Sequence, residues 1–311
     1  MKFSCLAGHF EAPRYGFHTQ KRKRWHRPSK DRQNATGSSG RRQNATGSSG
    51  LCDNIRMIIQ KKVMAIDEGR QMNNQIEKLL REKGADIVRF VDISALPASQ
   101  TQGFTRAIVF CIALPPSFIL AMSGGEQTDR NEFAGRNKFA DRNEFADRDE
   151  FADRDEFADK ERETDALADM LAEYIRREGY MAFSQSEESL LRGGYYDEKN
   201  HITKLPHKTI ARLAGIGFIG KNDLLINEKY GCAFSMCTVL TDAPVTAGIN
   251  PIVPPGCGDC GICKTACAEC AIVGNEWSET TGRDGLVDVF KCTCSLKCMV
   301  DCPYTLRYAR S

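Results

Sequence analysis

The sequence predicts an α/β fold, a mixed sheet domain followed by a small cysteine-rich module toward the C-terminal end. Two observations lead to this prediction. Helix and strand patterns alternate from about residue 70 to residue 240, as in α/β proteins. Nine of the fourteen cysteines then lie between Cys257 and Cys302. The α/β part, residues 51–250, is long enough to bury a core of its own.

The elements of this domain follow one another along the chain. Apolar residues recur at helical spacing from Met72 to Leu80, and Gly84 suits the C-terminal cap of that helix. A second amphipathic helix is expected over 167–175, ended by Gly179, and a third over 206–213. Strands are expected at 87–91, 107–113, 180–183 and 232–240, of which 107–113 is a continuous apolar run that suits a buried strand.

Residues 1–50 differ in composition from the rest. They hold eleven Lys and Arg against two acids, Glu11 and Asp31, and the unit from Arg32 to Gly40 is repeated from Arg42 to Gly50. Such sequence buries too little apolar area to offset the entropy of ordering. We expect a basic, disordered and solvated tail, with nucleic-acid binding as the alternative.

A second unusual segment, residues 128–160, repeats a six-residue unit close to Asp-Arg-Asn-Glu-Phe-Ala. On a helix, six residues advance a side chain by about 600°, so successive Phe residues point in different directions. This period does not make an apolar stripe. We expect an inserted repeat array that is weakly helical or disordered, and the alternative is an oligomerisation segment.

The cysteines near the C-terminal end follow a metal-binding pattern. Cys257, Cys260, Cys263 and Cys267 read CxxCxxCxxxC, the spacing of bacterial ferredoxins, in which three thiolates hold one iron-sulfur cube and the fourth binds another. A partner run is formed by Cys292, Cys294, Cys298 and Cys302, and ends in Cys302-Pro303. The spacing predicts a ferredoxin-like domain over 251–311 that carries two [4Fe-4S] clusters.

The crossing rule assigns the ligands of each cluster. Cluster one takes Cys257, Cys260, Cys263 and Cys302, and cluster two takes Cys292, Cys294, Cys298 and Cys267. Cys270 is left over, as a buried thiol or a substitute ligand. Zinc is the alternative metal, although the spacing differs from the two CxxC pairs of a zinc ribbon. Disulfides require an oxidising compartment, and we expect a cytoplasmic protein because residues 3–7 are too short an apolar run for a signal peptide.

Residues 215–221 match the letters of a dinucleotide-binding GxGxxG motif. Such a motif must follow a strand and begin a helix, whereas here a helical pattern precedes it. We therefore reject a nicotinamide site. The glycines still indicate a place where the backbone closely approaches a flat group or another chain segment.

Four segments together resemble the epoxyqueuosine reductase family and its shorter relatives, which are similar to reductive dehalogenases. They are residues 205–221, residues 240–244, the first cysteine run and residues 302–308. The resemblance implies an α/β domain that holds cobalamin beside two [4Fe-4S] clusters, with electrons passing through the clusters to cobalt. In the family reductases this chemistry converts epoxyqueuosine in tRNA to queuosine.

The resemblance also implies site residues. The loop that contains Gly215, Gly217 and Gly220 would lie against the corrin ring, and Lys221 or Asn222 would hydrogen-bond its amide side chains. Cluster two would be the one nearer cobalt. The aspartate that donates a proton in the family corresponds to His201, and a histidine can supply a proton near neutral pH. The alternative is that His201 is an ordinary loop residue.

These observations predict an oxidoreductase resembling epoxyqueuosine reductase, which passes electrons through two [4Fe-4S] clusters to a corrinoid site. The alternatives are a non-catalytic ferredoxin-type electron-transfer protein and a zinc-binding interaction module. Expected partners are an electron-donor protein and tRNA. No membrane association is expected, because no stretch is long and apolar enough to span a bilayer.

Overall fold

The computed structural model describes residues 49–124, 152–248 and 250–311. The chain divides into two units, and the fold discussed below is formed by residues 67–311. Of the other unit, only residues 49–66 are described, as the first part of helix α2 (Ser49–Glu82). The predicted disordered tail up to residue 48 and residues 125–151 of the repeat insert lie outside the described residues.

A four-stranded sheet is the centre of the larger unit, in the order β1-β2-β8-β3. The strands are β1 (Ile87–Asp92), β2 (Arg106–Ala113), β8 (Phe234–Thr241) and β3 (Ala182–Ser184). Every pairing between them is antiparallel, so the predicted mixed sheet is wrong. Strands β2 and β3 do run in the same direction. They do not pair with each other, however, because β8 lies between them and is antiparallel to both.

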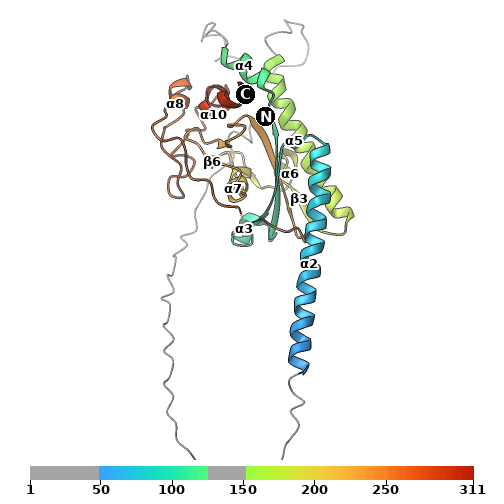
Figure 1. Cartoon of the computed structure of the whole chain (residues 1–311). Coiled ribbons are helices and arrows are strands. Elements are labelled where there is room, and N and C mark those ends of the chain that lie inside the picture. The colour runs from blue at the N-terminus through green and yellow to red at the C-terminus, as the bar shows by residue number, and fades with distance from the viewer. Residues whose placement is uncertain (1–48, 125–151, 249) are drawn as a thin grey trace, which may run out of the picture. The chain divides into compact units, whose positions relative to one another are not determined.

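Helices pack on both faces of this sheet (Figure 1). On one face, α2 and α5 (Ala152–Arg177) bury residues such as Ile76 and Leu171 against Phe110 of β2. On the other, α7 (His207–Leu213) packs Ile210 against the face of β2 that carries Val109. Burial on both faces explains the continuous apolar sequence of β2. The predicted caps are also confirmed, because Gly84 and Gly179 follow α2 and α5 with φ of 95° and 92°.

A third core attaches the cysteine segment, residues 250–311, to the sheet domain. Helix α4 (Pro116–Gly124) contributes Phe118 to it, while α9 (Lys297–Val300) and α10 (Pro303–Ala309) contribute Met299 and Ala309. Residues 152–160 of the predicted insert form the start of α5, and half-buried Phe157 packs against this core. The last repeat unit is thus part of an ordinary packed helix.

Two small hairpins connect the helices on the cysteine-segment side of the sheet. Helix α3 (Ala98–Thr101) lies between β1 and β2, and α6 (Glu187–Arg192) leads to the hairpin of β4 (Tyr196–Asp197) and β5 (Ile202–Thr203). After α7 comes the hairpin of β6 (Phe218–Ile219) and β7 (Leu225–Ile226). Among the described helices, none has the length and apolar character needed to cross a membrane.

Candidate functional site

The first cysteine run is shaped by a turn and one short helix. The N–H of Cys260 donates to the carbonyl of Cys257 at 3.0 Å, which folds the chain back on itself. Helix α8 (Ile262–Ala266) then carries Cys263, and Cys267 follows at its C-terminal end. The thiols of this run therefore lie along one compact loop.

The second run ends at the start of helix α10. Cys292 and Cys294 lie in a loop, Cys298 belongs to α9, and Cys302 is the N-cap of α10 with Pro303 in the first helical turn. Proline is favoured there because the missing N–H would have no helical partner. The Cys-Pro pair therefore fixes Cys302 where the helix begins.

The structure brings cysteines of both runs together in two groups: Cys257 and Cys302 pack in one, and Cys263, Cys267, Cys292, Cys294 and Cys298 pack in the other. Burial, and then the neighbouring thiols of Cys302 and Cys260, raise the pKa of Cys257. Burial and the thiol of Cys257 likewise raise the pKa of Cys263 to about 11. In the other group, burial and then Cys292, Cys263, Cys267 and Cys294 raise the pKa of Cys298. Cys302 of the second run thus lies with Cys257 of the first, while both Cys263 and Cys267 of the first run lie with Cys298 of the second.

Burial, and then this crowding, disfavour the thiolate form of Cys257, Cys263 and Cys298 in the free protein. Like charges that lie close together raise one another's pKa, and a bound cationic centre removes this penalty. The donor set therefore fits metal centres that are bound by deprotonated thiols. Within the described residues, no three His, Cys, Asp or Glu side chains converge on a position for one single metal ion.

Cys232 was predicted to begin the strand 232–240. The structure places it before β8, buried, with its N–H bonded to Thr305 Oγ1 at 3.1 Å. Its thiol hydrogen-bonds Cys302, which is the main cause that lowers the pKa of Cys302 to about 6. A ninth cysteine therefore touches the first group. By contrast, Cys270 is exposed, so a buried thiol at that position is ruled out.

The glycine loop joins helix α7 to the β6–β7 hairpin. This setting agrees with the rejection of a nicotinamide site, since no strand precedes the loop and no helix follows it. A Cβ at Gly217 would overlap the carbonyl oxygen of Ile226, and one at Gly220 would overlap the Ile226 side chain. At Gly215, φ is 65° and a Cβ would lie 2.8 Å from Pro251 O. The glycines permit close packing of the chain on itself.

Lys221 and Asn222 connect this loop with the cysteine segment. Lys221 Nζ donates to the carbonyls of Gly258 and Cys260 at 2.6 and 3.2 Å. Asn222 Nδ2 donates to the carbonyl of Cys298 at 3.0 Å and lies 3.8 Å from Cys232 Sγ. One residue thus binds each cysteine run, which the sequence did not predict.

His201 lies in the turn of the β4–β5 hairpin, with φ of 53°. Its Nδ1 is 2.8 Å from the hydroxyl of Tyr196, and its ring lies 5.6 Å from the ring of Phe290 in the cysteine segment. Burial raises the pKa of Tyr196, so its hydroxyl is protonated at neutral pH. Sequence reasoning missed Tyr196, although tyrosine is a recognised acid-base residue and lies five positions away.

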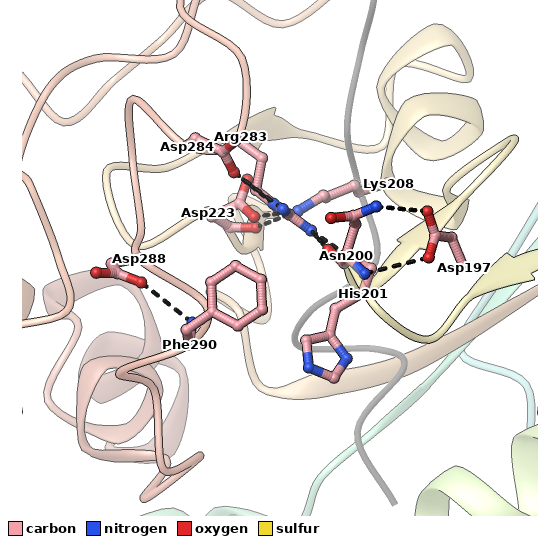
Figure 2. A network of polar contacts seen from close by, with 9 residues as sticks. All are labelled: Asp197, Asn200, His201, Lys208, Asp223, Arg283, Asp284, Asp288 and Phe290. Atoms are coloured by element: carbon pink, nitrogen blue, oxygen red, sulfur yellow. Dashed lines mark hydrogen bonds and ion pairs between the residues drawn. The ribbon is translucent and has the colours of Figure 1, made fainter.

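Buried charges lie next to this hairpin (Figure 2). Lys208 of α7 forms an ion pair with Asp223, and the side chains are 8% and 2% exposed. The pKa of Asp223 is raised by burial, which Lys208 and Arg283 oppose. Arg283 comes from the cysteine segment and reaches the turn that contains His201.

Two buried polar atoms near this hairpin have no hydrogen-bond partner in the described structure, Gln185 Oε1 and Thr203 Oγ1. Gln185 Nε2 donates to the carbonyl of Leu205 at 3.0 Å, which places the amide beside strand β5. Leaving such atoms unpaired is costly, so they indicate a place for a water or for polar groups of a ligand. His207 Nδ1 lies 3.0 Å from Thr238 Oγ1 of β8.

The fold resembles that of a redox enzyme. The catabolic reductive dehalogenase NpRdhA superposes with a TM-score of 0.54 and 18% identity, over 79% of this chain and 34% of that one. The fold of the described part of this chain therefore resembles that of about a third of the dehalogenase. No protein-family model matches the chain.

Curated relatives indicate which family part of this chain resembles. Epoxyqueuosine reductase of Staphylococcus aureus is 37% identical over 71 residues, which cover 23% of this chain and 18% of the relative. The same enzyme of Escherichia coli is 36% identical over 66 residues, 21% of this chain and 17% of the relative. The match thus spans less than a fifth of the length of these relatives. Within that span, the predicted resemblance to epoxyqueuosine reductases is confirmed.

Proposed function

We propose that this protein is an iron-sulfur oxidoreductase of the epoxyqueuosine reductase type. The observation that supports the proposal best is that cysteines of the two runs lie together, Cys302 with Cys257 and Cys267 with Cys298. When bound, two [4Fe-4S] clusters supply single electrons and a corrinoid supplies the reduction of the substrate. The name of the curated relatives favours epoxyqueuosine as that substrate, and the family resemblance implies that tRNA carries it.

The cysteine groups would hold the two clusters as the crossing rule assigns them. Cluster one is bound by Cys257, Cys260, Cys263 and Cys302, and cluster two by Cys292, Cys294, Cys298 and Cys267. Lys221 and Asn222 hold backbone carbonyls of the two runs, and so keep both loops against the sheet domain. Outer contacts of this kind tune metal centres as well as orienting their ligands.

A corrinoid would bind on the side of the sheet domain that carries the glycine loop. Of the predicted contacts Gly215, Gly217, Gly220, Lys221 and Asn222, the half-buried Gly215 and Lys221 are the ones that a ligand could reach, because the other three are buried against the chain itself. The unpaired atoms of Gln185 and Thr203 add a donor-acceptor pair that suits the amide side chains of a corrin. The hairpin that holds Thr203 also holds His201, so the same element reaches the proposed proton donor.

His201 is the proposed proton donor, and Tyr196 is its partner. To donate a proton, the ring must carry a hydrogen on both nitrogens, so Nδ1–H then donates to the Tyr196 oxygen. The Nε2–H is the proton that is transferred, neutral imidazole is left, and Tyr196 holds the remaining proton at Nδ1. Phe290 lies against the imidazole and limits the orientations of the ring.

The cysteine assignment is tested by a matched pair of variants, Cys298→Ala and Cys270→Ala. Cys298 belongs to the second group, while Cys270 is an exposed thiol outside both groups. After purification without oxygen, we expect Cys298→Ala to lose about half of the iron and acid-labile sulfide, because one cluster of two is lost. Cys270→Ala should keep both at the wild-type level.

Other results would favour one of the alternative functions. Zinc without sulfide in oxygen-free material would indicate the zinc module. Iron and sulfide without any change of the corrin spectrum on cobalamin titration would favour the ferredoxin-type electron-transfer protein. Reduction of epoxyqueuosine-containing tRNA by the cobalamin-loaded protein would be the positive result, with His201→Gln as its inactive control.

A further inference from the structure

We propose that Arg283 is a positioning residue that holds His201 in its working conformation. The proposal rests on the role given to His201 above. Arg283 belongs to the cysteine segment, far from His201 in sequence, and its side chain is 2% exposed. The contacts in Figure 2 show how the guanidinium reaches the turn of the β4–β5 hairpin.

The guanidinium binds two consecutive backbone carbonyls of that turn. Its Nη1 donates to the carbonyl oxygen of Asn200 at 3.1 Å and to that of His201 at 2.6 Å. Nε and Nη2 both approach Asp284 Oδ1, at 3.0 and 2.9 Å. Because Asp284 fixes one edge of the planar group, the direction of the other edge is also fixed.

The turn needs an external support, because His201 adopts a left-handed backbone conformation. A φ of 53° is unfavourable for a residue with a Cβ. Asp197 supports the turn from within by accepting the N–H groups of Lys199 and Asn200 at 3.0 and 3.2 Å. Asp197 satisfies the donors of the turn, and Arg283 satisfies its acceptors. Between them they stabilise a conformation that the chain alone disfavours.

The same segment also controls the imidazole. Phe290 follows Arg283 in the cysteine segment, two residues before Cys292, and its ring lies against His201. Arg283 holds the backbone of His201, Phe290 contacts the ring, and Tyr196 binds Nδ1. The position of the proton donor is therefore set from the segment that carries the second cysteine group. Such preorganisation removes motion that would otherwise misplace the transferred proton.

The proposal is tested with Arg283→Met, and Arg212→Met serves as the matched control. Arg212 is also a largely buried arginine, but its guanidinium stacks 4.2 Å over Trp277 and pairs with Glu279 instead of reaching the hairpin. The main readout is hydrogen-deuterium exchange at the imidazole carbon of each histidine, followed by mass spectrometry on the cluster-loaded protein. His207 is an internal reference, because Arg283 does not bind it.

In Arg283→Met we expect exchange at His201 to rise about threefold or more, because the turn loses its fixed acceptors. Exchange at His207 should not change, and Arg212→Met should behave like the wild type. Arg283→Lys keeps the buried charge but lacks the planar guanidinium. We expect its His201 exchange to lie between the values for the wild type and Arg283→Met. Iron content and cobalamin affinity should be unchanged, while turnover of the cobalamin-loaded protein falls without a change in KM.

Two results would overturn the proposal. The first is equal His201 exchange in Arg283→Met and wild type. The second needs no variant, namely equal His201 exchange in the folded and the urea-unfolded wild-type chain. If His201 exchange responds as expected in a protein that reduces no substrate, the positioning role holds and the proposed reaction fails. The two failures are thereby distinguishable.

Discussion

The buried ion pair between Lys208 and Asp223 shows how single residues constrain this part of the molecule. Both side chains are nearly inaccessible, and Lys208 Nζ also donates to the backbone carbonyl of Asp223 at 3.0 Å. Asp223 has a φ of 60°, so the lysine holds a residue in a left-handed conformation. Arg283 and His201 repeat this arrangement nearby, again with a buried cation that supports a left-handed residue.

Removal of this lysine should destabilise the protein strongly. In Lys208→Met, Asp223 is left buried without its partner, and we expect the free energy of unfolding to fall by about 3–5 kcal/mol. Urea denaturation followed by circular dichroism measures the change. Lys204→Met is the control, because Lys204 is exposed and its nitrogen only lies 5.2 Å from the Tyr195 ring. A similar loss of unfolding free energy in both variants would show that the Lys208–Asp223 ion pair makes no specific contribution to stability.

Sequence patterns predicted some site residues and missed others for physical reasons. The eight cysteines could be predicted as cluster ligands because such ligands must follow a fixed spacing, and this assignment stays a prediction. Tyr196, Cys232 and Arg283 were missed because their roles depend on contacts between segments that are distant in sequence. Cys232, for example, reaches Thr305 only because Gly231 lets the chain pass close to the first turn of α10. A glycine directly before a cysteine was the one available signal.

At the scale of elements, the glycine loop is the part most sensitive to a small change. In Gly217→Ala the new methyl group would overlap the backbone carbonyl of Ile226, which cannot move without opening the β6–β7 hairpin. We expect a loss of about 1–3 kcal/mol in unfolding free energy. Gly124→Ala is the control, because a Cβ there meets no atom within 4 Å, and its stability should change by less than about 0.5 kcal/mol.

The long strands and helix 206–213 were predicted well, but the two hairpins and the short helices were not. Helices α2 and α5 begin at Ser49 and Ala152, well before the helices expected over 72–80 and 167–175. Strands 87–91 and 107–113 and helix 206–213 correspond to β1, β2 and α7 within one or two residues at each end. Strands of two residues, such as β4 and β6, are too short to show a period. The direction of β8 was also missed, because alternation shows which face is buried but not which way a strand runs.

For the whole molecule, two groups next to β8 give opposite contributions to pH-dependent stability. Burial lowers the pKa of His207 from its usual 6.5 to about 4, and burial raises that of Asp165 to about 6. The unfolded chain binds a proton at His207 below pH 6.5, so this contribution to stability is lost as pH falls toward 4. The folded chain holds a proton at Asp165, so that contribution is lost as pH rises from about 4 to 6.

These signs lead to opposite expectations for two variants. Between pH 7 and pH 5, the unfolding free energy of His207→Gln should fall less than that of the wild type, by about 1–2 kcal/mol. In Asp165→Asn it should fall more, by about 1 kcal/mol, because the favourable protonation is absent. Urea titrations at the two pH values measure both differences. If the unfolding free energies of the wild type, His207→Gln and Asp165→Asn depended on pH in the same way, the contributions assigned to His207 and Asp165 would be contradicted.

The central place of β8 in the sheet affects how the chain is made. A nascent polypeptide leaving the ribosome has completed β2 by residue 113, yet that strand has no partner on one side until residues 234–241 emerge. Throughout this interval it presents an open, apolar edge, which is a typical target for chaperones. Cys257 follows the strand that closes the sheet. The cysteines from Cys257 to Cys302 are therefore synthesised only after all four strands of the sheet.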